Sequence, residues 1–400
     1  MRILFCNYEY PPLGGGGGVV MAALARQLAR RHEVTVLTSR AGDLTAQSND
    51  QGVQVLRVPV FFRRQLAVAN FPSMLAYLPS GFVRGMGLRR RHFDVINTHF
   101  VVPTGPLGHA LARWHHLPNV LSVHGGDLFD PSKRSSPHLH ASLRAAVRWM
   151  LTAADDVVGQ SRDTVRHVND LYGVHRDVGL IPLGIERPPA RVAASRATFG
   201  LPHDAFVMVT IGRLVARKAT TQLVDVLAAS AILNAHLLVI GDGPDAPAIR
   251  QRAVELGVAD RVHLPGQVSE TEKYAALAIA DAFVSTSQHE GFGLVFLEAM
   301  ACGLPVVCYD RGGQTDFLTS GETGFVVKLN DTAAFTHAVR AIHADIYLRR
   351  RLGQRNRQTV ENYFIDSCAA RYEQVFEAVV DRRLAVHRGA APTSPGPDHP

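Results

Sequence analysis

Cysteine is scarce in this 400-residue chain, and long apolar runs are missing. The four cysteines form no C-x-x-C pair and no spacing typical of metal ligands, so we expect neither a disulfide framework nor a metal site. The longest apolar stretches, such as Ala235–Ile240, have the length of a strand, whereas a membrane-spanning helix needs about 20 apolar residues. The N-terminus lacks a signal-peptide pattern, because polar residues follow shortly after Cys6. These absences and the free thiols predict a cytoplasmic protein.

Acidic residues are missing between Asp50 and Asp94, where the sequence carries seven arginines. Removing these from the 42 basic residues leaves 35, the number of acidic residues, so this segment accounts for the whole net charge of +7. The arginines and the apolar residues among them are Arg57, Arg63, Arg64, Arg84, Arg89, Arg90 and Arg91, and Phe61, Phe62, Leu66, Phe71, Met74, Leu75, Tyr77, Leu78 and Phe82. This composition is typical of a surface that contacts anionic lipid headgroups, at about 1 kcal/mol per nearby arginine.

Two interpretations of residues 57–91 stay open. One is peripheral contact with the inner face of an anionic membrane, and the other is an insertion beside a binding cleft whose arginines are merely solvated. No helix-turn-helix, RNA recognition motif or zinc finger accompanies the arginines, so we expect no nucleic-acid partner.

Short apolar strands alternate with amphipathic helices twice along the chain. Continuous β-branched runs that end in glycine or aspartate are typical of a parallel sheet covered on both faces, which predicts doubly wound α/β domains. The first domain is predicted over residues 1–185 and the second over 206–366, with the proline-containing residues 186–205 as a linker. The amphipathic stretch 367–385 exceeds what the second sheet needs, and residues 389–400, rich in Pro and Gly, are predicted to be disordered. Because ligands of open α/β sheets bind at the carboxyl ends of strands, functional residues are expected there.

Five consecutive glycines, residues 14–18, follow the first predicted strand and precede a helix. Without Cβ atoms, backbone N–H groups approach an anion closely at a helix N-terminus, so Gly16 and Gly17 are predicted to contact a ligand phosphate. A dinucleotide fingerprint is not supported, because its glycine spacing is absent and residues 38–40 (Thr-Ser-Arg) lack the acidic residue that binds a ribose. A flexible linker is the alternative.

Arg213 and Lys218 lie on a loop directly after the first strand of the second domain. Two long cations on one strand-end loop can converge on a diphosphate, which arginine binds as a fork and lysine as a point charge. Arg217 is predicted to face the solvent instead. The alternative for all three is an ordinary set of surface cations.

The segment from Gln288 to Pro305 contains two glutamates separated by a glycine-flanked turn. A helix is predicted to begin near Gly293, so that the N–H groups of Gly293, Leu294 and Val295 are available to phosphate. Glu290 is suited to accept hydrogen bonds from sugar hydroxyls, and Glu298 from a ribose diol. In the alternative interpretation these two glutamates bind no ligand, and one caps the helix while the other lies on the surface.

In the first domain, His124 follows a predicted strand within a His-Gly-Gly-Asp element. A histidine there faces the ligand edge of the sheet and can hydrogen-bond a sugar hydroxyl or a departing phosphate, although a structural histidine is the alternative. His99 and Asp127 are weaker candidates for contact with an acceptor substrate.

Together these motifs resemble a retaining glycosyltransferase of family 4 with the GT-B fold, over nearly the whole chain. The resemblance rests on the glycine loop, the His124 element, the 212–218 loop, a Gly-Asp-Gly-Pro turn at 241–244, and Glu290 and Glu298 with their context. It implies two Rossmann-like domains facing a cleft, with a C-terminal helix that crosses back to the first domain. Two positions depart from the family pattern: Ala219 replaces a glycine, and Leu-Gly-Ile-Glu at 183–186 replaces Asn-Gly-Val-Asp.

The resemblance also implies roles for individual residues. Arg213 and Lys218 would hold the donor diphosphate, Glu298 the ribose, and Glu290 the donor sugar, with His124 as a further catalytic residue. The remaining donor contacts are Gly212, Gly241, Gly243, Gly291, Phe292, Gly293, Leu294 and Val295.

The resulting expectation is a metal-independent transfer of a hexose from a nucleotide-diphosphate sugar to a hydroxyl acceptor, with retention of configuration. No DxD-like carboxylate pair occurs in a phosphate-binding context, so cations would replace a metal, and no cofactor is expected. UDP-, GDP- and ADP-sugars all fit, and the basic segment suggests a lipid-linked or anionic acceptor in cell-envelope glycolipid or polysaccharide synthesis. The alternatives are a sugar-nucleotide epimerase and a non-catalytic nucleotide-sugar-binding module; a nicotinamide dehydrogenase is disfavoured by the glycine spacing.

Overall fold

The chain folds into two compact units. The structure is a computed structural model that describes residues 1–61, 63, 71–88, 93–131, 135–190 and 192–387. Unit 1 comprises Met1–Phe129, Ser135–Gly184 and the segment from Ile365 onward, and unit 2 comprises Ile185–Phe364 with a short segment that begins at Asp130.

Unit 1 is built on an eight-stranded sheet in the order β3-β4-β2-β1-β5-β6-β7-β8. Neighbouring strands are parallel except β3, which pairs antiparallel with β4. The strands are β1 (Arg2–Cys6), β2 (Glu33–Arg40), β3 (Gln47–Asp50), β4 (Val53–Pro59), β5 (Val95–His99), β6 (Asn119–Val123), β7 (Asp156–Gly159) and β8 (Gly179–Leu180). The helices are α1 (Gly16–Ala29), α2 (Phe71–Met86), α3 (Gly105–His115), α4 (Ala141–Ala153), α5 (Arg162–Tyr172) and α12 (Ile365–His387).

Alternating side chains of β1 explain why this strand is apolar throughout. Ile3 and Phe5 belong to a core cluster with residues of α1 and α12, whereas Leu4 and Cys6 belong to a second cluster with residues of α2 and α3. Because successive side chains of a strand point to opposite faces, both faces of the sheet are covered, as the continuous apolar runs predict.

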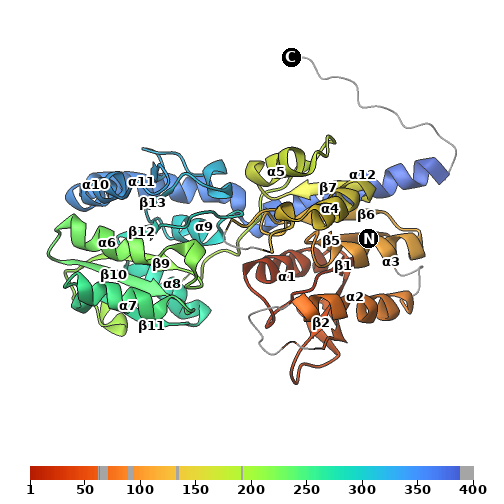
Figure 1. Cartoon of the computed structure of the whole chain (residues 1–400), viewed down its shortest axis with the longest axis horizontal. Coiled ribbons are helices and arrows are strands. Elements are labelled where there is room, and N and C mark those ends of the chain that lie inside the picture. Colours follow the sequence, from red (N-terminus) through yellow and green to blue (C-terminus); the bar gives the residue numbers. More distant parts are fainter. Residues whose placement is uncertain (62, 64–70, 89–92, 132–134, 191, 388–400) are drawn as a thin grey trace, which may run out of the picture. The chain divides into compact units, whose positions relative to one another are not determined.

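Helix α12 comes from the far end of the sequence and packs in unit 1 (blue in Figure 1). The Phe376 ring meets the Phe5 ring edge-on at 6.4 Å, and the Tyr372 hydroxyl donates to Ser122 Oγ at 3.0 Å. Glu373 accepts from Arg31 at 2.6 Å and pairs with His32 at 2.7 Å, which fixes the helix beside the C-terminal end of α1.

Unit 2 contains a six-stranded parallel sheet in the order β11-β10-β9-β12-β13-β14. The strands are β9 (Phe206–Ile211), β10 (Ala235–Ile240), β11 (Val262–Gly266), β12 (Ala282–Ser285), β13 (Val306–Tyr309) and β14 (Gly324–Val327). The helices are α6 (Thr221–Ser230), α7 (Ala246–Glu255), α8 (Glu270–Ile279), α9 (Leu294–Ala301), α10 (Thr332–Ala344) and α11 (Ile346–Val360).

The segment predicted as a linker, residues 186–205, belongs to unit 2. It contains a short 3-10 helix, Arg196–Phe199, and the Arg196 guanidinium donates to Ile279 O and pairs with Asp281 at 3.1 Å. These contacts anchor a proline-containing stretch that has no strand or helix periodicity. The predicted disordered tail, 389–400, lies outside the described residues.

The acid-free segment between Asp50 and Asp94 is partly core. Tyr77 of α2 is fully buried and donates a hydrogen bond from its hydroxyl to Leu37 O at 2.8 Å, so this member of the basic and apolar segment is not part of a surface. The Arg63 guanidinium lies 4.9 Å from the centre of the Tyr8 ring. Leu75 and Val83, in contrast, are 51% and 67% exposed on the outer side of α2. Residues 62, 64–70 and 89–92 of this segment lie outside the described part, and they include the named Phe62, Arg64, Leu66, Arg89, Arg90 and Arg91.

No helix within the described residues combines the length and the hydropathy required to cross a membrane.

Replacing Phe376 with alanine is expected to destabilise unit 1 by about 3–5 kcal/mol, because the buried ring leaves a cavity against Phe5. Both tryptophans of the chain, Trp114 and Trp149, belong to unit 1, so their fluorescence during urea unfolding follows this unit. Leu384→Ala, on the same helix but 46% exposed, is the control and is expected to change stability by at most about 0.5 kcal/mol. Equal unfolding midpoints for the two variants would contradict the packing described for α12.

Candidate functional site

The loops that follow β9 and β10 lie against one another through their main chains. Gly212 N donates to Ile240 O at 3.0 Å, and Leu214 N donates to Asp242 O at 2.9 Å. Gly241 has a φ of 129°, and a Cβ at this position would lie 2.0 Å from Gly212 O. A Cβ on Gly243 would lie 2.2 Å from Leu214 O. The two glycines predicted as donor contacts therefore also permit the close approach of these loops.

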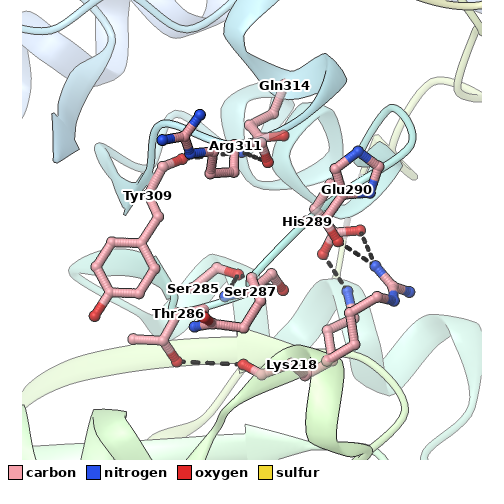
Figure 2. Close-up of polar contacts among 11 residues, drawn as sticks. Lys218, Ser285, Thr286, Ser287, His289, Glu290, Tyr309, Arg311 and Gln314 are labelled. Carbon is pink, nitrogen blue, oxygen red and sulfur yellow. Dashed lines mark hydrogen bonds and ion pairs between the residues drawn. The ribbon is translucent and has the colours of Figure 1, made fainter. Parts of the chain in front are cut away.

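Lys218 and Arg217 both contact the carboxylate of Glu290, each at a different oxygen atom. Lys218 Nζ pairs with Glu290 Oε1, and Arg217 Nη1 lies 3.4 Å from Glu290 Oε2 (Figure 2). Arg217 Nη1 also donates to His289 O. The main chains join as well, since Gln288 N donates to Arg217 O at 2.8 Å.

Arg217 is the cation turned inward, and its predicted exposure to solvent is wrong: 22% of its side chain is exposed. The 3-10 turn Ala216–Lys218 directs residues 217 and 218 toward the segment before α9. Arg213 is the exposed member of the loop and forms no hydrogen bond or ion pair with the part of the chain that the structure describes. A Cβ on Gly212 would lie 3.3 Å from Lys218 Cε, so the lysine stem passes directly over the residue that precedes Arg213.

Ala219 ends this turn in the left-handed region, with a φ of 45°. Glycine adopts that conformation without the steric cost that a Cβ imposes, which gives a physical reason for the glycine expected here. Thr286 Oγ1 donates to Lys218 O at 3.3 Å (Figure 2). It also donates to Ala219 O at 3.0 Å, and these bonds secure the turn despite its alanine.

Glu290 is 6% exposed and ionised. Burial alone would raise its pKa, but the charges of Lys218 and Arg217, with hydrogen bonds from Lys218 and Ser287, lower the pKa to about 2. The backbone is held on both sides, because Glu290 N donates to Arg311 O at 3.3 Å and Gly313 N donates to Glu290 O at 2.8 Å.

Helix α9 begins directly after Gly293, which has a φ of 90° and provides no side-chain cap. Within the described residues, the N–H groups of Gly293, Leu294 and Val295 donate no hydrogen bond to another backbone group. They carry the positive end of the helix dipole, as predicted for an anion site. Phe292 is 3% exposed and packs on Phe317, so only its main chain is available to a ligand. Gly291 lies in the same turn.

Glu298 pairs with a lysine that the motif analysis did not single out. Lys273 Nζ of α8 lies 2.8 Å from Glu298 Oε1 and 2.7 Å from Glu270 Oε1. Burial raises the pKa of Glu298, although the charge of Lys273 opposes this. The spacing of residue types along α8 does not say which neighbouring helix the Lys273 side chain reaches.

In unit 1, Asn97, His99 and His124 form a buried hydrogen-bonded chain. Asn97 Nδ2 donates to Val120 O and to Ser122 Oγ, both at 2.9 Å, so Asn97 Oδ1 faces His99 Nε2 at 2.6 Å and accepts a hydrogen bond from it. His99 Nδ1 then accepts from His124 Nε2 at 2.9 Å. Burial lowers the pKa of His124 to about 4 and that of His99 well below its usual value, so both rings are neutral at pH 7.

His99 and Asp127, the two predicted acceptor contacts, both have hydrogen-bond partners inside unit 1. Both ring nitrogens of the buried His99 are engaged inside unit 1. Asp127 accepts from Val101 N at 2.6 Å and from His124 N at 2.9 Å, and burial raises its pKa to about 6. The Phe100 ring stacks on His124 at 4.1 Å.

The glycine loop already has an anionic neighbour, Glu9. Gly15 N donates to Glu9 Oε2 at 3.2 Å, so one N–H group of the predicted anion loop is satisfied by a carboxylate of the chain. A Cβ on Gly17 would lie 2.3 Å from Phe100 Cζ, so a larger residue there would have to displace the tip of this ring. Gly16 begins α1.

Comparison with known proteins now assigns the family. The family model described as "Glycosyltransferase Family 4" matches residues 14–187, and the one described as "Glycosyl transferases group 1" matches residues 192–359. The D-inositol 3-phosphate glycosyltransferase of Stackebrandtia nassauensis is 30% identical, over 86% of this chain and 83% of its own. The chain belongs to the group 1 glycosyltransferases of family 4.

Solved structures of this fold include sucrose-phosphate synthase from Thermosynechococcus elongatus, with a TM-score of 0.81 and 22% identity over 95% of this chain and 99% of that one. Anabaena HepE in complex with UDP-glucose has a TM-score of 0.72 and 18% identity over 94% of this chain and 99% of that one. The predicted GT-B fold of this family 4 glycosyltransferase, with two Rossmann-like units, is confirmed.

The close contact between the loops after β9 and β10 of this glycosyltransferase can be tested by a substitution at Gly241. Gly241→Ala is expected to lower the melting temperature of unit 2, because its Cβ would collide with Gly212 O. Gly257→Ala is the matched control: its φ of 65° is also positive, but a Cβ there meets nothing within 4 Å. Calorimetric melting compares the two variants, and equal losses would show that backbone strain, not loop contact, is responsible.

Proposed function

We propose that this glycosyltransferase transfers a hexose from a nucleotide-diphosphate sugar to a hydroxyl acceptor, with retention of configuration and without a metal ion. The observation that carries the proposal is the meeting of the 212–218 loop with the segment that leads into α9. In unit 2 this contact joins a loop that carries three cations to the segment that precedes the N–H groups at the start of α9, and binding of a diphosphate would draw on positive groups of both kinds.

Charge development in the reaction explains how these groups would act. Cleavage of the sugar–phosphate bond places negative charge on the diphosphate, which Arg213, Lys218 and the N–H groups at the start of α9 would stabilise. Glu290 would bind sugar hydroxyls and Glu298 the ribose diol. His124 is neutral and would hydrogen-bond a sugar hydroxyl. The acceptor would attack from the face of the leaving group, and the departing phosphate would take its proton.

UDP-glucose is the first donor to test, because HepE was solved in complex with it. A thermal-shift screen of UDP-, GDP- and ADP-sugars, followed by turnover with candidate acceptors, identifies the donor, and the anomeric NMR coupling of donor and product tests retention. Incubation of the donor alone separates transfer from epimerisation, because only an epimerase would yield an isomerised nucleotide sugar.

Arg213→Met and Lys218→Met are each expected to lower turnover by about 100-fold or more without unfolding unit 2, because each removes positive charge from the proposed leaving-group site. Arg250→Met, an exposed arginine on α7, is the control and is expected to turn over normally. Excess EDTA is expected to leave the rate unchanged. Near-normal turnover in both cation variants, or a rate abolished by EDTA, would refute the assignment.

We further propose that α2 of unit 1 rests on an anionic membrane, which fits a lipid-linked acceptor in cell-envelope glycolipid or polysaccharide synthesis. Its outer face carries Pro72, Leu75, Pro79 and Val83, all exposed and spaced along one side of the helix. Arg84 is exposed beside them, and no acidic residue lies between Asp50 and Asp94. Apolar side chains with a basic surrounding suit anionic headgroups rather than a neutral protein surface.

Sedimentation with phosphatidylglycerol vesicles at low salt tests this surface, and the protein is expected to sediment with them but not with phosphatidylcholine vesicles. The double variant Leu75→Ser/Val83→Ser is expected to stay in the supernatant, because it loses the apolar contacts. Val254→Ser, which changes a 64% exposed residue of unit 2, is the control. Absence of sedimentation in the unsubstituted protein would rule out the membrane contact.

A further inference from the structure

Two cations share one buried carboxylate, yet the proposed function needs only one of them for the donor. Lys218 Nζ forms an ion pair with Glu290 Oε1. Arg217 Nη1 donates hydrogen bonds to Glu290 Oε2 and to His289 O. Arg217 directly precedes Lys218, and the motif comparison assigns it no role.

The two side chains differ in how firmly they are held. Among the described residues, the Lys218 ammonium contacts Glu290 alone, and its flexible stem crosses Gly212. Arg217 is fixed by its side chain to the carbonyl of His289 and by its own carbonyl to Gln288 N. Lys218 can therefore turn to a ligand while Arg217 stays in place.

A diphosphate that draws Lys218 away would leave Glu290 with less compensation. A carboxylate that is 6% exposed is strongly unfavourable without a cation, and it responds by taking up a proton. Arg217 is the second cation on this carboxylate. The other groups around it are the Ser287 hydroxyl, the buried Cys308 thiol of β13 and Arg311, whose side chain is 57% exposed and lies 3.7 Å from Asp310.

We propose that Arg217 is a positioning residue of the donor site, which keeps Glu290 ionised and in place when Lys218 moves from Glu290 to the donor diphosphate. This inference rests on the proposed function. It assigns the two cations different tasks: Lys218 exchanges one anion for another, and Arg217 makes that exchange possible without protonation of Glu290.

Inorganic pyrophosphate is the probe, because its binding does not depend on the base or the sugar. Arg217→Met is expected to bind it about 10- to 100-fold more weakly. Arg217→Met is also titrated with pyrophosphate by calorimetry at pH 7 in buffers of different ionisation heat. Its binding of pyrophosphate is expected to take up more protons than that of the unsubstituted protein, because Glu290 becomes protonated when Lys218 leaves it. Arg217→Lys is expected to restore most of the affinity, and Arg250→Met is the control.

A double-variant cycle separates positioning from direct binding. In a Glu290→Gln background no carboxylate needs compensation, so Arg217→Met is expected to have little further effect on pyrophosphate affinity. An equal loss in both backgrounds would overturn the proposal, because Arg217 would then act on the ligand or on the fold. The proposal would also be overturned if Arg217→Met bound pyrophosphate with the affinity and the proton uptake of the unsubstituted protein. Failure of the unsubstituted protein to bind pyrophosphate would instead refute the diphosphate site of the proposed function, and the role of Arg217 with it.

Discussion

The Glu290 carboxylate is the group on which the polar arrangement of unit 2 depends. It is buried, ionised and shared by two cations of the 212–218 loop, while its own backbone is bonded to residues 311 and 313. Removing a charge from water is costly, so this buried carboxylate persists only because cations and hydrogen-bond donors compensate it. The same requirement brings together the loop after β9, the turn into α9 and the segment after β13.

Much of the fold could be predicted from the sequence because its central strands are continuous apolar runs, which belong in a parallel sheet covered on both faces. Two elements of unit 1 escaped this reasoning. Strand β3 has the sequence Gln-Ser-Asn-Asp and no apolar pattern, so only its pairing with β4 reveals it. Helix α2 contains Pro72, Pro79 and two glycines, residues that argue against a helix. Gly81 and Gly85 pack there against Leu107 and Leu111 of α3, so tertiary contact outweighs propensity.

Some residues of the candidate site could be predicted from the sequence, and others could not. Glu290, Lys218 and the start of α9 could be predicted because glycine-rich strand ends and charged side chains are local features of the sequence. Orientation within a loop is not local: the 3-10 turn at Ala216–Lys218 decides that Arg217 points inward while Arg213 is exposed. Two contacts were not predicted. Lys273 reaches Glu298 from a different helix, and Glu9 reaches Gly15 from outside the glycine loop. Spacing of residue types carries no information on such contacts.

The C-terminal helix has a consequence for the order in which the protein is made. Unit 2 consists almost entirely of one continuous stretch, Ile185–Phe364, whereas unit 1 needs Phe376 and Tyr372 to complete the core beside β1. During translation the second unit emerges whole from the ribosome while the first still lacks a helix. The N-terminal half, although synthesised first, is thus the last to reach its native packing, and until then the apolar surface under α12 is open to chaperones.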